Sequence, residues 1–448
     1  MKIIGKTKAH ILLALCLCIF LLAIGCASTV YPEEDFVISD NGIPEMYIDL
    51  FDNNGRTIPL ANVTREEYVD SVITLTNTKE QYKLDSVKAY FKGRGNGSWF
   101  NSGDKKGYKI KFDKKQSVFG REKNKHWVIL ACSNFDDVTM CRNYLAYNMA
   151  GAVFNGIEYT TPAYWIDVYV NGEYRGVYLL CEHVRVDNGR VDIECEYGVD
   201  DTGYLIEYDA YAGGEVGVDY FRVDGVKYAF TVHSPNPEDG EYETEGGITK
   251  ERFKQQVAFI KDYVSRVYRA ALNGDYSAFA ELVDVDSFVD MYLLHELFKN
   301  IDTGYSSFYL YKKPHGKLYA GPAWDFDATT TGDDNRGDRT PQGIYVADKV
   351  REMSDFTSSE LFIALYKTHG FQAVLRSRWK VVSPKIKAFL DRRLNDRVYE
   401  AYKQVMGRNF ALWKGKSQET AERDWIADVK ALKKWLLDRI AWLDIEWA

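Results

Sequence analysis

The chain has 448 residues, of which 46% are hydrophobic and 15% aromatic, so it can bury a large core and is not a disordered protein. Its 57 basic and 65 acidic residues give a formal net charge of −8, which argues against nucleic-acid binding by charge. The length allows two or three compact units.

The first 25 residues have the pattern of a secretory signal. Lysines precede an apolar run at residues 11–24, which is too short to span a membrane comfortably as a mature helix. The ending Leu22-Ala-Ile-Gly-Cys26 resembles a bacterial lipobox, which implies lipid attachment at Cys26. We therefore expect a signal peptide at 1–25, a polar tether at 26–44 and an extracytoplasmic protein that is lipid-anchored to the bacterial cell membrane. An uncleaved anchor is the alternative.

Four cysteines follow this segment: Cys132, Cys141, Cys181 and Cys195. Outside the cytoplasm they could form two disulfides in any of three connectivities. Four buried thiols that act as small hydrophobic residues are the alternative. The sequence has no Cys-x-x-Cys pair, so it does not indicate a zinc site.

Residues 45–247 are predicted to be rich in β-strands because apolar and polar residues alternate along them. The predicted strands cover residues 46–50, 72–76, 87–91, 108–112, 126–130, 166–170, 174–180 and 204–208. Asn171-Gly172 joins two of these strands and is a strong hairpin signal. A helix is predicted at 136–151. The Gly- and acid-rich stretch 211–245 is predicted to be an inserted loop.

A glycine-rich turn in this half has the composition of a phosphate-binding loop. Its sequence is Lys92-Gly-Arg-Gly-Asn-Gly-Ser-Trp99. The amides of Gly93 and Gly95 could cradle a phosphate, and Arg94 adds positive charge. A plain turn without a ligand is the alternative.

The strand that follows this turn carries two lysines. Lys109 and Lys111 share one face because side chains of a strand alternate with a period of two. A glycine-rich turn followed by a strand lysine is how a kinase places a cation on nucleotide phosphates. Solvated strand lysines are the alternative.

From residue 248 the composition becomes helical. Helices are predicted at residues 253–272, 286–300, 361–369, 371–391 and 424–447. A β-hairpin is predicted at 308–319, between the second and third of these helices.

The hairpin should bring three carboxylates together. Asp302 lies just before its first strand, and Asp325 and Asp327 lie just after its second strand. Such a cluster is tolerable when a divalent cation holds it, and oxygen ligands suit Mg²⁺, which keeps positions open for phosphate. The order helix, Asp, hairpin, Asp-Phe-Asp is also the order of parts in protein kinases. Solvated acids on a surface hairpin are the alternative.

Several motifs in the same order resemble the CotH family of spore coat protein H-like atypical kinases. They are Phe91-Lys-Gly-Arg-Gly-Asn-Gly-Ser-Trp99, Lys105-Lys-Gly-Tyr-Lys-Ile-Lys-Phe112, Tyr169-Val-Asn-Gly-Glu-Tyr-Arg-Gly-Val-Tyr-Leu179, Asn300-Ile-Asp302 and Gly321-Pro-Ala-Trp-Asp-Phe-Asp327. The resemblance covers roughly residues 45–445. It implies an α+β, minimal protein-kinase-like fold, with a β-rich N-lobe at 45–247 and a helical C-lobe at 248–448.

The resemblance also implies ATP as phosphate donor, Mg²⁺ or Mn²⁺ as cofactor, and Ser/Thr phosphorylation of secreted, cell-surface or coat proteins; we expect a monomer. The family's catalytic Asp falls on Asp302 and its metal-binding Asp on Asp325, with Asp327 as the second carboxylate of that motif. The aromatic ring that covers adenine falls on Tyr319.

Two further positions follow from the resemblance. The phosphate-contacting lysine is Lys111 or Lys109. Kinases place an Asn five residues after the catalytic Asp as a ligand of the second metal, and this chain has Ser307 there, whose hydroxyl is a weaker ligand.

Two other functions are open at this point. One is a surface binding or scaffold lipoprotein without phosphotransfer, which Ser307 and the lipid anchor favour. The other is a glycosidase that uses Asp302 and Asp325 as its carboxylate pair. A zinc peptidase is excluded, because His295-Glu296 begins the HExxH pattern but Lys299 occupies the position of the second His.

Overall fold

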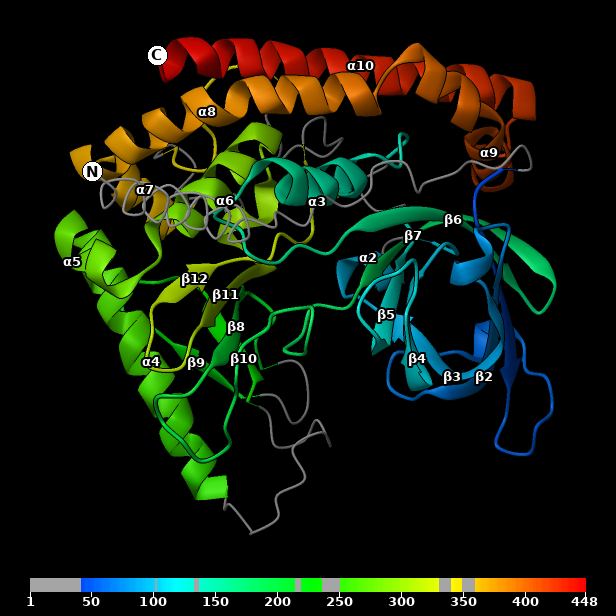
Figure 1. Cartoon of the computed structure of the whole chain (residues 1–448), viewed down its shortest axis with the longest axis horizontal. Helices are drawn as coiled ribbons and strands as arrows, with labels where there is room; N and C mark the ends of the chain where they lie inside the picture. The colour runs from blue at the N-terminus through cyan, green and yellow to red at the C-terminus, as the bar shows by residue number, and fades with distance from the viewer. Residues whose placement is uncertain are drawn as a thin grey trace, which may run out of the picture. The chain divides into compact units, whose positions relative to one another are not determined.

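The computed structural model describes residues 42–100, 103–132, 137–213, 219–235, 250–329, 340–348 and 359–448. The predicted signal peptide and Cys26 lie outside these residues. Within them the protein combines strands and helices, so it is an α+β protein as predicted (Figure 1).

The first part of the chain forms a closed β-barrel. Its strands, in the order in which they pair, are β1 (Glu45–Phe51), β2 (Val69–Thr76), β3 (Leu84–Arg94), β4 (Gly107–Gln116), β5 (Asn124–Leu130), β7 (Glu173–Glu182) and β6 (Ala163–Val170). The parallel pairing of β1 with β6 closes the barrel. Alternate side chains, such as Ile48, Phe91 and Ile110, fill its interior. This two-residue period is the signal that predicted the strands.

A five-stranded antiparallel sheet lies between the barrel and the helix α4 in the view of Figure 1. Its strands, in order, are β12 (Leu318–Ala320), β11 (Phe308–Lys312), β8 (Tyr204–Asp209), β10 (Ala229–Ser234) and β9 (Tyr220–Arg222). Phe308 and Leu310 belong to the large core that the sheet shares with the helices, whereas Tyr309 on the opposite face pairs with Glu207.

Part of the stretch 211–245 forms strands, which was not predicted. We predicted an inserted loop, but β9 and β10 lie within its described residues. Strand β10 is buried because it pairs with β8, and Phe230 enters the core. The local sequence carries few signs of this, because β9 is only three residues long and the pairing is with a neighbour brought in by the fold.

Helices cover the remaining core. They are α2 (Gly97–Phe100), α3 (Arg142–Val153), α4 (Lys250–Leu272), α5 (Tyr276–Leu282), α6 (Val285–Phe298), α7 (Glu360–Tyr366), α8 (His369–Arg393), α9 (Asp396–Lys414) and α10 (Gln418–Glu446). The last long helices, α8 and α10, run side by side (Figure 1).

Three of these helices, α2, α5 and α9, were not predicted; α2 is a single turn within the predicted glycine-rich loop. Helix α9 has clear end signals: the Asn395 side chain accepts from the N–H of Val398, and Gly415 ends the helix in the left-handed conformation. Helix α5 is short and begins with an Asp275 cap.

In the part of the chain that the structure describes, the four remaining cysteines form no disulfide, which agrees with the alternative to the disulfides. Cys132, Cys141 and Cys181 are buried and Cys195 is half-buried. Among the residues that the structure describes, no helix is apolar over a length sufficient to cross a membrane.

Candidate active site

The three acidic side chains singled out in the sequence meet in space. One carboxylate oxygen from each of Asp302, Asp325 and Asp327 lies within 4.8 Å of the others. The hairpin of β11 and β12, in which Leu310 pairs with Ala320, returns the chain to the end of α6 and so brings the segments together. The predicted proximity of these carboxylates is confirmed.

Asn300 joins the two segments that carry the carboxylates. Helix α6 ends at Lys299, which adopts the left-handed conformation, and a short 3₁₀ turn (Ile301–Gly304) contains Asp302. The Asn300 side chain accepts from the N–H of Asp302 at 3.1 Å and donates to the carbonyl oxygen of Asp325 at 3.0 Å. This double contact fixes one carboxylate relative to the other.

Ser307 lies beside Asp325, and both have unusual backbone angles. Their φ values are +62° and +61°, in the left-handed region that costs a residue with a side chain about 1–2 kcal/mol. The Ser307 hydroxyl donates to the Asp325 carboxylate at 3.2 Å. Two strained residues in mutual contact are a feature of functional sites, where the surrounding structure stabilises such conformations.

Strand β8 adds two acidic residues that sequence reasoning missed. Glu207 accepts from the backbone N–H of Ser307 at 3.1 Å and hydrogen-bonds His233 at 2.7 Å. Asp209 accepts from the Ser306 hydroxyl at 3.0 Å, and burial together with the neighbouring Glu207 raises the pKa of Asp209. Their two-residue spacing on a predicted strand was the available signal, because it puts both on one face.

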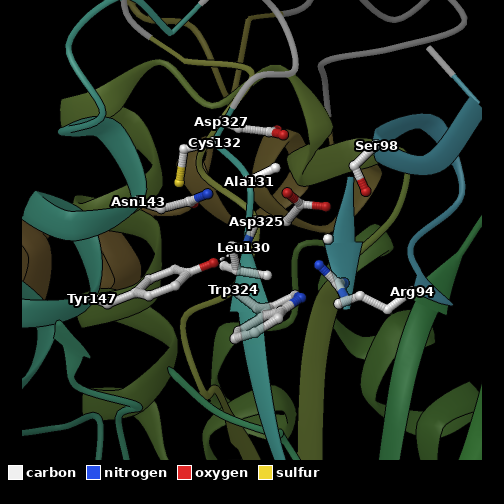
Figure 2. Close-up of a pocket in the computed structure, with 11 residues that line it drawn as sticks. Arg94, Ser98, Leu130, Ala131, Cys132, Asn143, Tyr147, Trp324, Asp325 and Asp327 are labelled. Carbon is white, nitrogen blue, oxygen red and sulfur yellow. Dashed lines mark hydrogen bonds between the residues drawn. The ribbon is translucent and has the colours of Figure 1, made fainter. Parts of the chain in front are cut away.

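A cavity at the acidic cluster lies between the barrel, helix α3 and the segment that follows β12 (Figure 2). It is lined by Arg94, Ser98, Gly107, Leu130, Ala131, Cys132, Asn143, Tyr147, Trp324, Asp325 and Asp327. In Figure 2, Arg94 and Ser98 enter from the side opposite Asn143 and Tyr147. The Arg94 guanidinium also lies over the Trp324 ring, 5.5 Å from its centroid. The cavity therefore combines carboxylates with hydrogen-bond donors.

The glycines of the turn have different roles. A Cβ atom at Gly93 would lie 2.3 Å from the Trp99 ring, so the indole requires glycine there. The Gly93 N–H donates to the carbonyl oxygen of Thr64 at 2.7 Å, so this amide is not available to an anion. Gly95 has a φ of +94°, which favours glycine, and the chain turns there toward Ser98. Arg94, between the two glycines, and Ser98 are the residues of the predicted loop that reach the cavity.

The strand register separates the two candidate lysines. Arg94 pairs with Gly107, Lys92 with Lys109 and Tyr90 with Lys111. Lys109 is therefore on the same outer face of the barrel as Arg94, about 7 Å further along the strand, and Lys111 is twice as far. Neither belongs to the lining of the cavity among the described residues.

Tyr319 also lies outside this lining. Its ring stacks on Tyr311 with centroids 5.1 Å apart, and the Lys313 ammonium group is 4.3 Å from its centroid. The ring belongs to the hairpin and is half-buried. Its role toward adenine stays a prediction.

Helix α3 supplies the wall of the cavity that faces Arg94. Arg142 donates to the carbonyl oxygen of Asp327 at 2.9 Å, Asn143 accepts from the N–H of Phe326 at 2.6 Å, and Tyr147 accepts from the N–H of Asp325 at 3.0 Å. A helix was predicted here, but none of its contacts with the 325–327 segment was.

A comparison with protein families identifies the family of this chain. The family model described as CotH kinase protein matches residues 91–443, a span that runs from β3 into α10 and contains every residue of the cavity. A search of curated proteins found no match. Because the family model covers most of the chain, this protein belongs to the CotH family.

Proposed function

We propose that this protein is an ATP-dependent kinase that transfers the γ-phosphate to Ser/Thr hydroxyls of extracytoplasmic proteins with Mg²⁺ or Mn²⁺. The observation that carries the proposal is the cluster of Asp302, Asp325 and Asp327 within 4.8 Å, at a cavity whose other side holds Arg94. Carboxylates and a guanidinium around one cavity suit a metal–triphosphate complex, because the carboxylates can bind the metal ion and the guanidinium can bind the phosphate oxygens.

The residues present fit a divalent metal ion. Asp325 and Asp327 offer carboxylate oxygens, and the Ser307 hydroxyl lies against Asp325. Mg²⁺ bound there would neutralise charge on the phosphate oxygens. Asp302 accepts or orients the proton of the acceptor hydroxyl, and Arg94 binds phosphate oxygens from the barrel side, with Lys109 next along the strand. Kinase-like lobes, with the barrel as N-lobe, are part of this proposal.

Two alternatives were open from the sequence. A glycosidase would use Asp302 and Asp325 as its carboxylate pair, but it leaves Arg94 and the glycine-rich turn beside the cavity without a role. A scaffold lipoprotein without phosphotransfer is favoured by Ser307, which replaces the kinase Asn. Nucleotide binding distinguishes the two functions, because a kinase requires it and a scaffold does not.

The location of the protein is also a proposal. The signal-like first 25 residues and Cys26 support export and a lipid anchor in the bacterial cell membrane. An enzyme in that place meets secreted and cell-surface proteins as substrates. We propose that it acts as a monomer.

The decisive experiment measures phosphate transfer from radiolabelled ATP to a generic acidic protein. We expect labelling by the wild type in Mg²⁺, its loss on chelation, and a drop of about 10²–10⁴-fold in Asp302→Ala. Asp262→Ala is the control, because Asp262 is exposed on α4 and pairs with Arg266 one turn along that helix. Equal labelling by the wild type and Asp302→Ala would overturn the kinase. A wild type that neither binds Mg·ATP by calorimetry nor melts at a higher temperature in its presence would favour the scaffold.

A further inference from the structure

Helix α3 binds the backbone of the Asp325–Asp327 segment through three side chains. As described above, Tyr147, Asn143 and Arg142 contact one backbone group each at positions 325, 326 and 327. These bonds occupy backbone groups only, so they fix the segment without using either carboxylate as their acceptor. The carboxylates are thereby held toward the cavity.

The contact with Phe326 determines how the Asn143 amide is oriented. A backbone N–H can only donate, so the Asn143 atom that faces it must be the carbonyl Oδ1. The Nδ2 group then points away from Phe326, and Figure 2 shows it directed into the cavity, beside Cys132. Asn143 is 4% exposed and its amide also hydrogen-bonds the Cys132 thiol. Nδ2 carries two hydrogens, and sulfur is a weak acceptor for one of them.

We propose that Asn143 is a catalytic residue, whose Nδ2 group donates a hydrogen bond to an oxygen of the γ-phosphate; this inference rests on the proposed function. Asn143 lines the cavity together with Asp325 and Asp327, opposite Arg94. A neutral donor suits this position physically. A lysine there would form ion pairs with the carboxylates and compete with the metal ion, whereas an amide binds a phosphate oxygen and leaves the carboxylates to the cation.

The test compares ATP with ADP in an isosteric variant. Asn143→Asp keeps an oxygen that can accept from Phe326 N–H, but it replaces the donor by a charge that repels phosphate. We expect calorimetry on the full chain in Mg²⁺ to give a dissociation constant for ATP that rises about tenfold or more, with that for ADP changed by less than about twofold. The matched control is Asn148→Asp on the same helix, where the amide donates to the carbonyl oxygens of Tyr144 and Ala163.

Each outcome decides between roles. An equal loss of ATP and ADP affinity in Asn143→Asp would overturn the phosphate contact and leave a positioning residue for the 325–327 segment. Unchanged affinity for both would overturn it as well. If Asn143→Asp does not fold, as judged by its melting transition, Asn143→Ala is measured in the same way and must show the same preferential loss of ATP. A wild type that binds neither nucleotide would overturn the proposed function together with this inference. If the wild type binds both nucleotides, the comparison with Asn143→Asp tests the role of Asn143 alone.

Discussion

The two β-sheets of this protein are built in different ways. In the barrel, β1 to β5 pair in chain order and the Asn171-Gly172 turn joins β6 to β7, so most contacts link neighbours in the sequence. The five-stranded sheet joins strands of two segments, 204–234 and 308–320, which α4, α5 and α6 separate in the sequence. Its assembly therefore depends on packing against helices.

This difference explains what each sheet contributes to the cavity. The barrel presents regularly spaced side chains, of which Arg94 reaches the cavity. The other sheet positions acids from separate parts of the chain, such as Glu207 on β8 and Asp325 after β12, and Ser307 connects them through its backbone N–H and its hydroxyl. A cation on a regular strand needs little support, whereas clustered carboxylates must be held against their mutual repulsion.

The largest effect on nucleotide affinity should come from removing the charge that the barrel contributes. Arg94→Met is expected to raise the dissociation constant of Mg·ATP about 10- to 100-fold, because a charged hydrogen bond to phosphate is lost. Its thermal unfolding should change little, since the side chain lies at the cavity. Calorimetry and a melting curve measure both. Arg56→Met is the control, because Arg56 pairs with Asp52 in the loop after β1. Unchanged affinity in Arg94→Met would show that the barrel does not face the nucleotide.

A second test concerns the junction between the barrel and the last helices. Lys105, just before β4, is 4% exposed and donates to Asn409 of α9 at 3.0 Å, and burial lowers the pKa of its ammonium group to about 7. The unfolded chain, with a pKa near 10.5, binds more protons than the folded protein between pH 7 and 10.5. The contribution of Lys105 to stability therefore rises with pH through that window and is constant below it.

Urea denaturation of the wild type and Lys105→Met at pH 7 and pH 9.5 measures this effect. The difference between the free energy of unfolding of the wild type and that of Lys105→Met should increase in favour of the wild type as the pH rises. Lys123→Met, on the barrel surface just before β5, should keep a constant offset from the wild type. A constant difference for Lys105→Met as well would mean that the buried amine stays charged in the folded protein throughout.

The smallest effect is expected at Ser307, where the site departs from the kinase pattern. Ser307→Asn restores the residue that kinases use, and Asn tolerates the left-handed conformation found at this position. We expect the free energy of unfolding to rise by up to about 1 kcal/mol and Mn²⁺ to bind more tightly. Denaturant titration and Mn²⁺ titration measure the two changes. Tighter Mn²⁺ binding without any gain in phosphate transfer would favour the scaffold over the kinase.

Local patterns predicted most of the regular structure. The strands of the barrel and the helices α3, α4, α6, α8 and α10 followed from residue periodicity. The hairpin pattern brought Asp302, Asp325 and Asp327 together, and the glycine-rich turn singled out Arg94. The misses differ in cause, and for helix α9 the capping residues Asn395 and Gly415 were a signal that the prediction did not use. The short strands β9 and β10 exist because β8 offers them an edge, and α5 is a short helix whose single turns carry little periodic signal.

By itself, the sequence determined that acidic residues flank a hairpin, because a hairpin returns the chain to its starting point and this needs only local turn chemistry. Tertiary structure decided which groups complete the site. Asn143, Tyr147 and Glu207 reach the acidic segment from α3 and β8, at sequence separations of 100 residues or more. No local pattern specifies such contacts, since they form only when packing of the shared core sets the distance between these elements.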